Sequence, residues 1–310
     1  MDIAKLFFKL SCLIAFVILV KFSLKELVTQ YGVKSYLGEH LQSKLNDPKK
    51  LIYFLGSSRM QFGIRTKMLN DMFNDVQFFN LGTDGGLFLN NIILADALFE
   101  TKKPNVIIIE LSSLKNSLTP NVQEICTFKK LSYITNSIKT NQLNLDFINF
   151  KLKCYANFFK NELNLSEELW HLRKSNRAEL FEYRDLKRSY DVGASTILTK
   201  EMLSQNLLIT LYEQRLILSS IHYLTQKAEQ TNTSIFFLLP LTMRSPDERA
   251  LIIPVFNALT NNLKVIYPDS LLVSIHDKKY LADSNHLNAL GAEAFTSFLI
   301  QYFKAVKTGR

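Results

Sequence analysis

Short apolar runs separated by longer amphipathic stretches constrain the fold of this chain more than any other feature. The runs read as strands buried on both faces, while residues 87–101 and 210–231 repeat apolar side chains at helical spacing. Strands that alternate with helices predict a parallel sheet covered on both faces. The predicted strands are residues 51–55, 76–79, 105–111, 234–239 and 263–267.

We therefore expect a three-layer α/β/α domain with a mostly parallel five-stranded sheet. In such sheets functional groups gather beyond the carboxyl ends of the strands. Ser58, Gly82 and the region of Ser112 each lie just past a predicted strand end. After Asn288 the chain repeats apolar residues at helical spacing, which predicts a last helix packed on the sheet.

Two short motifs at opposite ends of the chain carry side chains suited to catalysis. The first, Leu55-Gly56-Ser57-Ser58-Arg59, follows an apolar run and should place a serine on a tight strand-to-helix turn. In the second, Asp283 and His286 lie three residues apart, so both side chains can leave one helical turn in the same direction. A serine nucleophile needs a base, and a histidine base works best when a carboxylate orients it. Ser58, His286 and Asp283 are the candidates for these roles.

These motifs resemble the blocks of the SGNH (GDSL) hydrolases. Gly56-Ser57-Ser58 resembles the Gly-Asp-Ser block with Ser in place of Asp, and residues 283–286 match the terminal Asp-x-x-His block. The Gly-Ser-Ser form is similar to membrane-anchored members that modify envelope polymers, such as the D-alanine transfer protein of teichoic acid synthesis and the alginate O-acetyltransferase group. The resemblance implies a serine-dependent esterase or acyltransferase that acts on small, acetyl-like acyl groups of a cell-envelope glycan or an acylated donor.

The resemblance also implies an oxyanion hole built from the backbone N–H groups of Ser58 and Gly82. The family adds an asparagine from a third block, but after residues 106–111 this chain reads Ser112-Ser113-Leu114-Lys115-Asn116. One missing donor typically lowers turnover by about 10²–10³. The departure favours an alternative function, in which a catalytically weak or inactive SGNH-like protein is the partner of a membrane acyltransferase or polysaccharide export system.

Other interpretations of the same residues remain open. Ser57 and Ser58 could simply cap a helix, and Asp283 with His286 could be a surface pair. Arg59 could contact an anionic substrate or serve as a structural cation. Asn80, which precedes the glycine-rich loop, is a second candidate for substrate contact.

Residues 6–22 are almost all apolar and predict a membrane anchor within residues 1–27. Roughly 17 residues at about 1.5 Å each nearly span a ~30 Å hydrocarbon core, and the terminal lysines can snorkel. No small-x-small cleavage site follows, which favours a retained anchor over a removed signal peptide. Lysines flank both ends, so charge leaves the orientation undecided. The resemblance favours a single-pass protein whose domain, residues 28–310, lies outside the cytoplasm.

Between the third and fourth predicted strands lies a long excursion, residues 116–200. Helical spacing around residues 147–159 and 163–181 predicts a helical insertion. It is either an ordinary insertion or a lid or partner-docking subdomain over the site.

The charge of the chain bears on which classes of partner it can bind. Its 310 residues include 37 Lys and Arg against 28 Asp and Glu, a net charge of +9. The lysines are scattered and no nucleic-acid-binding signature is present, so we expect a membrane surface or an acidic polymer as partner rather than nucleic acid. No metal or cofactor is expected. Cys126 and Cys154 could form a disulfide in an oxidising compartment or remain buried thiols.

Overall fold

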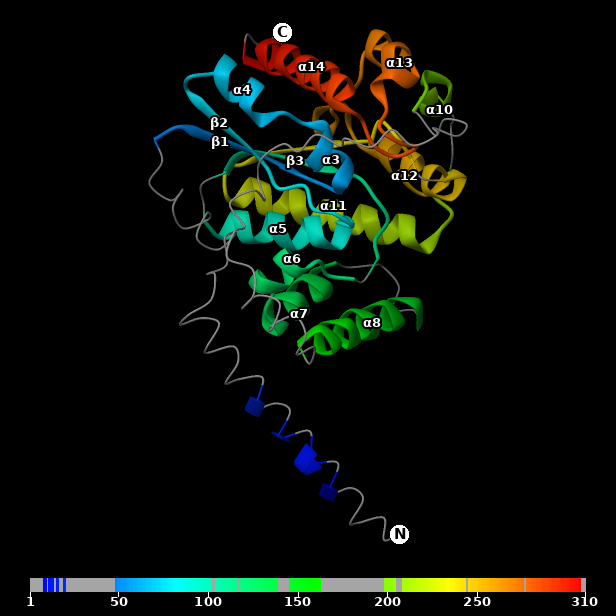
Figure 1. Cartoon of the computed structure of the whole chain (residues 1–310). Coiled ribbons are helices and arrows are strands. Elements are labelled where there is room, and N and C mark those ends of the chain that lie inside the picture. Colours follow the sequence, from blue (N-terminus) through cyan, green and yellow to red (C-terminus); the bar gives the residue numbers. More distant parts are fainter. Residues whose placement is uncertain are drawn as a thin grey trace.

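The computed structural model describes residues 8–9, 11–13, 15–16, 19–20, 48–101, 104–115, 117–138, 145–162, 198–204, 208–243, 245–275 and 277–307. Within this part of the chain, a parallel four-stranded sheet has helices on both faces (Figure 1). Its spatial order is β2-β1-β3-β4. The strands are β1 (Lys50–Leu55), β2 (Val76–Asn80), β3 (Pro104–Glu110) and β4 (Ser234–Leu238).

The prediction of a parallel α/β fold is confirmed, and four of the predicted strands form. Tyr53 of β1 pairs with Phe79 of β2 on one side and with Ile107 of β3 on the other. All residues of β1 after Lys50 are buried. This burial explains the unbroken apolar run, because helices cover both faces of the sheet.

The predicted fifth strand at residues 263–267 is wrong. In the described residues this segment meets β4 at one bridge, between Phe237 and Lys264, supported by a 2.9 Å bond from the Val265 N–H to the Phe237 carbonyl. Ile266 is 54% exposed, so the run is not buried on both faces. Pro268 then has no N–H to extend a ladder, and its carbonyl accepts the first bonds of the next helix.

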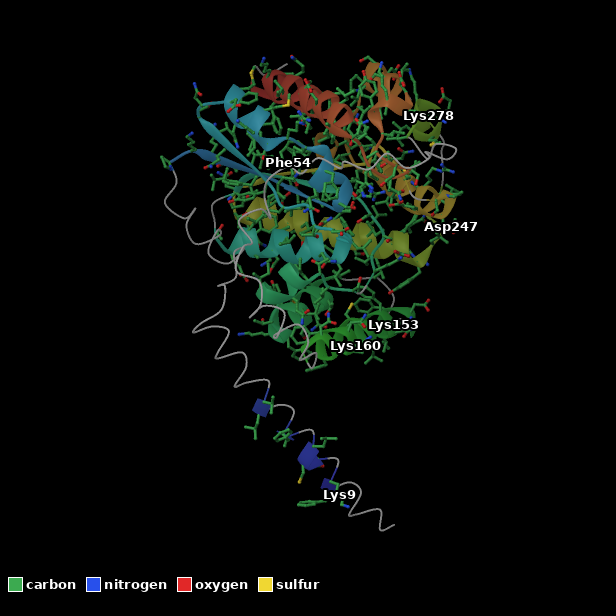
Figure 2. The ribbon with its side chains drawn as sticks, in the orientation of Figure 1. Lys9, Phe54, Lys153, Lys160, Asp247 and Lys278 are labelled. Carbon is green, nitrogen blue, oxygen red and sulfur yellow. The ribbon has the colours of Figure 1, made fainter. Side chains whose placement is uncertain are left out.

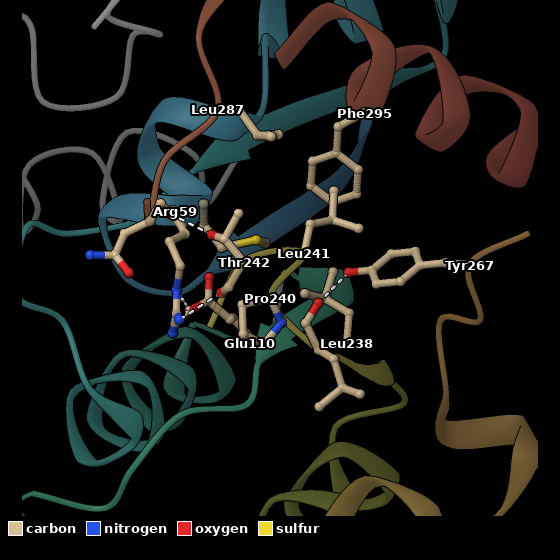
Figure 3. Close-up of a pocket in the computed structure, with 12 residues that line it drawn as sticks. Arg59, Glu110, Leu238, Pro240, Leu241, Thr242, Tyr267, Leu287 and Phe295 are labelled. Atoms are coloured by element: carbon tan, nitrogen blue, oxygen red, sulfur yellow. Dashed lines mark hydrogen bonds and ion pairs between the residues drawn. The ribbon is translucent and has the colours of Figure 1, made fainter. Parts of the chain in front are cut away.

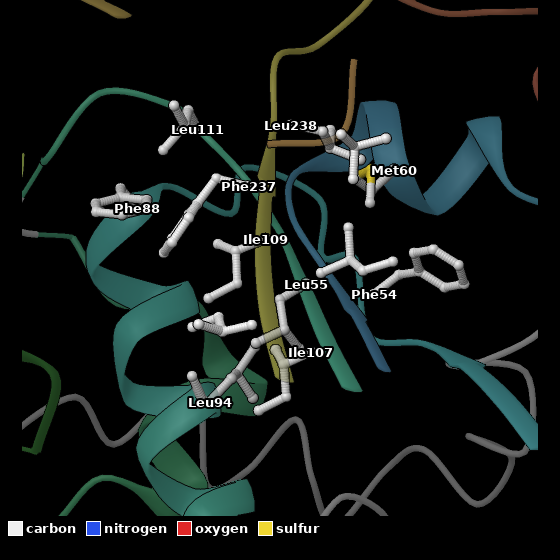
Figure 4. Packing of buried hydrophobic residues seen from close by; sticks show 14 of the residues in the cluster. Phe54, Leu55, Met60, Phe88, Leu94, Ile107, Ile109, Leu111, Phe237 and Leu238 are labelled. Atoms are coloured by element: carbon white, nitrogen blue, oxygen red, sulfur yellow. The ribbon is translucent and has the colours of Figure 1, made fainter. Parts of the chain in front are cut away.

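Helices of the two outer layers lie on opposite faces of the sheet (Figure 1). One layer holds α5 (Phe88–Glu100) and α11 (Tyr212–Gln230), and the other holds α4 (Thr66–Met72) and α14 (Ala289–Lys307). Figure 4 shows Leu94 of α5 beside Ile107, with Phe54 on the opposite side of the strands. Fully burying such side chains contributes about 1.5–3 kcal/mol each, so the sheet and its two helical layers form one core.

The other helices lie at the ends of the strands and in the insertion. The described part of the insertion is helical, as predicted, whereas residues 163–181, including Trp170, lie outside the described residues. The remaining elements are α3 (Ser58–Gly63), α6 (Pro120–Ile125), α7 (Phe128–Ser137), α8 (Leu145–Glu162), α10 (Lys200–Ser204), α12 (Pro246–Ala258), η2 (Asn261–Leu263), α13 (Asp269–Ile275) and η3 (Lys278–Tyr280).

The predicted anchor at residues 6–22 falls largely outside the described residues. Among the helices that are described, none combines the length and apolar character needed to cross a bilayer. The anchor stays a prediction from sequence.

The two cysteines of the insertion are thiols, and no disulfide joins them. Cys126 and Cys154 are both buried. Burial, together with the neighbouring Cys126, raises the pKa of Cys154 to about 12. A thiol with so high a pKa is a poor nucleophile, so this pair acts in packing.

Candidate active site

The turn between β1 and α3 places a serine at the carboxyl edge of the sheet. Ser57 is the N-cap of α3, and its Oγ accepts the Arg59 N–H at 3.2 Å. Ser58 is the first residue of the helix. Gly56 permits the turn because a Cβ there would lie 2.2 Å from Met60 Cγ and 3.0 Å from Glu110 Cβ.

Sheet topology makes this edge the natural place for a site. The chain runs from β1 to β2 on one side and later returns to β3 on the other side of β1. Ligand sites of open α/β sheets form where the strand order reverses in this way. Ser58, directly after β1, lies at that point.

Ser58, His286 and Asp283 form a continuous hydrogen-bonded relay. Ser58 Oγ lies 2.8 Å from His286 Nε2. On the other side of the ring, Nδ1 lies 2.9 Å from Asp283 Oδ1 and 2.8 Å from Oδ2. The structure thus brings together all three residues named from the sequence.

The carboxylate selects the tautomer of the imidazole. Nδ1 faces an acceptor-only group, so it carries the proton and donates to Asp283. Nε2 is then the acceptor for the Ser58 O–H, the arrangement that a base requires. Phe62 packs edge-on against the ring at a centroid distance of 5.7 Å and helps to fix its plane.

Asp283 is held as a carboxylate by its own loop. Burial alone would raise its pKa, but the N–H of Asn285, the His286 ring and the His286 N–H together outweigh burial and leave the pKa below its usual value. The two N–H bonds to Oδ1 are 2.7 Å and 2.9 Å long. The orienting acid is therefore ionised at neutral pH.

The last helix holds the loop that carries the base. The Ala282 N–H donates to the His286 carbonyl at 2.9 Å, and the Asn288 N–H donates to the Tyr280 carbonyl at 3.0 Å. Gly291 of α14 packs so tightly that a Cβ there would lie 2.2 Å from the Tyr280 oxygen. The His286 loop is thus clamped between η3 and α14.

The predicted oxyanion donor Gly82 is engaged elsewhere. Its N–H donates to Asn80 Oδ1 at 3.0 Å. Asn80 is buried, and its Nδ2 donates to the Met60 carbonyl at 2.8 Å. Both polar ends of Asn80 therefore tie the β2 loop to α3, and Gly82 could serve an oxyanion only if Asn80 released it.

Ser58 supplies the remaining backbone donor of the predicted pair. The first N–H groups of a helix have no acceptor within it, and Ser58 opens α3. Beyond β3, Ser112 is fully buried and its Oγ has no hydrogen-bond partner among the described residues. This hydroxyl lies directly beyond the carboxyl end of β3.

Arg59 lies inside the protein rather than in an open substrate site. Its side chain is 7% exposed, and Nη2 lies 2.9 Å from both Glu110 Oε1 and Glu248 Oε1. Nη1 donates to the Thr242 carbonyl at 2.9 Å. Burial lowers the pKa of Arg59, but the two carboxylates more than compensate and raise it above its usual value. Arg59 is a structural cation beneath the turn between β1 and α3.

Glu110 connects this cation to the turn itself. Its Oε1 accepts from Ser57 Oγ at 2.8 Å and from Arg59 Nε at 3.1 Å. A carboxylate at the end of the buried run in β3 requires such partners, so the sequence carried a signal for it. The other two partners of Arg59, Glu248 and Thr242, lie in distant segments and gave no comparable signal.

A small pocket lies on the inner side of this network (Figure 3). Arg59 and Glu110 line its polar end, while Leu287 and Phe295 line its apolar end. Asn285, next to the base, also lines it, and its Oδ1 is buried with no partner among the described residues.

No protein-family model and no curated protein matched the chain. Within the described residues, His, Cys, Asp and Glu side chains do not gather in groups of three or more that could hold a metal ion. A serine hydroxyl beside an imidazole that a carboxylate orients is suited to covalent acyl transfer, and this is the chemistry that the side chains of the site can perform.

Proposed function

We propose that the protein is an SGNH-like serine esterase or acyltransferase that acts on small acyl groups. The observation that carries the proposal is the Ser58–His286–Asp283 relay with its 2.8 Å contacts. In this function Ser58 is the nucleophile, His286 the general base and Asp283 the group that orients the ring.

The reaction proceeds in two halves. Ser58 Oγ forms a bond to the acyl carbon while its proton moves to His286 Nε2, and the C–O bond to the leaving group breaks as that proton passes to the departing oxygen. The oxygen of a water or a sugar hydroxyl then attacks the acyl carbon while its proton moves to Nε2. The bond from the acyl carbon to Ser58 Oγ breaks, and the proton on Nε2 returns to Oγ. Water completes hydrolysis, and a sugar hydroxyl completes transfer.

The candidate site has few donors to stabilise the oxyanion that forms during acyl transfer. The Ser58 N–H is available to an oxyanion, whereas the Gly82 N–H is held by Asn80 Oδ1 at 3.0 Å. Each absent donor costs about 10²–10³ in turnover. We therefore expect slow basal hydrolysis that rises when a substrate or partner draws Gly82 away from Asn80.

The same observation favours a second candidate function. With Gly82 engaged and Ser58 only 1% exposed, the fold could serve as a partner of a membrane acyltransferase or an export system without turning over substrate. An intact relay is not required for that role.

The cellular setting follows from the predicted anchor and the net charge of +9. We place the domain outside the cytoplasm, facing an envelope glycan. Reporters active on only one side of the membrane, fused after Arg310, should report the outer side, and a cytoplasmic signal would rule out direct action on an exported glycan.

A fluorophosphonate probe on the purified full chain separates the two functions. The probe should label the wild type and not Ser58→Ala, because the structure places the Ser58 hydroxyl against the His286 ring. His286→Ala should lose nearly as much labelling, since relay groups act as a unit, and Asp283→Asn should lose less. Ser204→Ala is the matched control, because Ser204 is exposed at the end of α10. A folded wild type that never reacts would favour the partner role.

A further inference from the structure

The α8 helix presents apolar side chains to solvent as well as to the core. Its inner face buries Cys154 and Phe158. On its outer face, Ile148 is 43% exposed, Leu152 60% and Phe159 49%. Exposed apolar patches on a folded protein commonly mark an interaction surface, so this outer face requires an explanation.

These outward residues form one continuous stripe. Ile148, Leu152, Ala156 and Phe159 follow each other at steps of four, four and three residues, which places them on one side of a helix. We call this set the outer stripe. It continues onto α7, where the half-exposed Phe128 lies 5.2 Å from Phe159 between ring centroids.

Lysines flank the outer stripe. Lys153 and Lys160 are exposed and follow Leu152 and Phe159 by one residue each, so they lie along one border. Lys129 of α7 is exposed beside Phe128. Figure 2 shows Lys153 and Lys160 on α8, at the end of the molecule away from α14. Asp146, at the start of α8, is an exposed carboxylate near this surface.

We propose that α8 lies on an anionic membrane surface, with the outer stripe in the headgroup layer and the lysines on lipid phosphates. An apolar arc bordered by lysines is the pattern of helices that lie in the plane of an interface. Lysine stems can extend along the apolar surface while their charges reach anionic headgroups. This docking is independent of the serine chemistry proposed above.

The chemistry of the surface favours a membrane over a protein groove. The outer stripe is a convex helix face, which a flat and deformable lipid layer can cover along its full length. The basic border matches anionic lipid, in keeping with the net charge of +9. A contact of this kind would also restrict how the domain tilts on the membrane.

A fluorophore on α8 tests the proposal in the full chain. Cys12→Ser removes an exposed thiol, and Cys126 and Cys154 are buried. Leu152→Cys is then labelled with an environment-sensitive dye and mixed with phosphatidylcholine vesicles that contain phosphatidylglycerol. Val273→Cys on α13, at a site 73% exposed, is the matched control. Nitroxide-bearing lipids should quench the dye at 152 several-fold more than the dye at 273.

Charge reversal separates lipid docking from other causes. Lys153→Glu with Lys160→Glu should reduce quenching at 152, and more so in vesicles with phosphatidylglycerol than in phosphatidylcholine alone. Equal quenching at 152 and 273 would overturn the proposal. So would a blue shift at 152 that persists without lipid in a chain that sediments as a dimer, because a second copy would then cover the stripe.

Discussion

Arg59, the buried cation beneath the turn between β1 and α3, allows a quantitative prediction. Glu110→Leu removes the carboxylate that accepts from Ser57 and twice from Arg59. Breaking a buried ion pair from one side typically costs about 3–5 kcal/mol. Arg59 keeps Glu248 and the Thr242 carbonyl, so we expect the lower end, about 3 kcal/mol. At about 2–4 °C per kcal/mol for domains of this size, the melting temperature should fall by about 6–12 °C.

A double-mutant cycle checks that the cost arises from the pairing itself. Arg59→Met combined with Glu110→Leu replaces both charges by apolar groups of similar length, which is often nearly neutral. The double variant should therefore lose about 2 kcal/mol less than the sum of the single variants, within the usual range for contacting residues. Thermal unfolding of the full chain, followed by circular dichroism, supplies the three values.

The control is an ion pair on the surface. Lys200 and Asp269 lie 2.5 Å apart but are 67% and 62% exposed, so Asp269→Asn should leave the melting temperature unchanged. If Glu110→Leu has the same melting temperature as Asp269→Asn, the ion pair between Arg59 and Glu110 does not stabilise the fold. The same conclusion follows if the losses of the two single variants simply add in the double variant.

Two further predictions concern the relay and its loop. The pKa of Asp283 is lowered in the folded state, so its contribution to stability is present above the pKa of the unfolded state and is lost as pH falls through the folded pKa. Asp283→Asn should flatten the acid side of the melting temperature against pH, and an unchanged acid side would contradict this. Gly82→Ala should lower both stability and probe labelling, because its Cβ would lie 2.6 Å from the Gln61 backbone nitrogen. Gly85→Asn is the control, since its φ of +68° suits Asn and a Cβ there meets nothing within 4 Å.

Local patterns predicted most of the fold. β1 is buried on both faces after Lys50, whereas β2 alternates buried and half-buried residues, and β3 and β4 each have an exposed residue near the start. Their apolar runs were nevertheless sufficient to predict all four strands. The run at residues 263–267 has a similar apolar sequence. It lies between the 3-10 helix η2 and Pro268, and it pairs with β4 at one bridge. A short apolar run indicates that a segment is partly buried, but it does not predict how many hydrogen bonds the segment makes to a neighbouring strand.

The sequence predicted those residues of the candidate site that belong to short motifs, and it did not predict contacts between distant segments. Asp283 and His286 share one loop, and Ser58 follows a strand, so short motifs located them. Glu248 meets Arg59 across 189 residues of sequence, and no spacing rule covers that distance. The engagement of Gly82 depends on Asn80 two residues away, a contact that the sequence allowed but did not require.

The clamp of α14 on the His286 loop sets an order of events during synthesis. Ser58 and His286 are separated by 228 positions, and His286 belongs to the loop that leads into α14. A growing chain can pair all its strands while its serine still has no partner. Ser58 therefore acquires its contact with His286 only after α14 has been made and has packed on the loop.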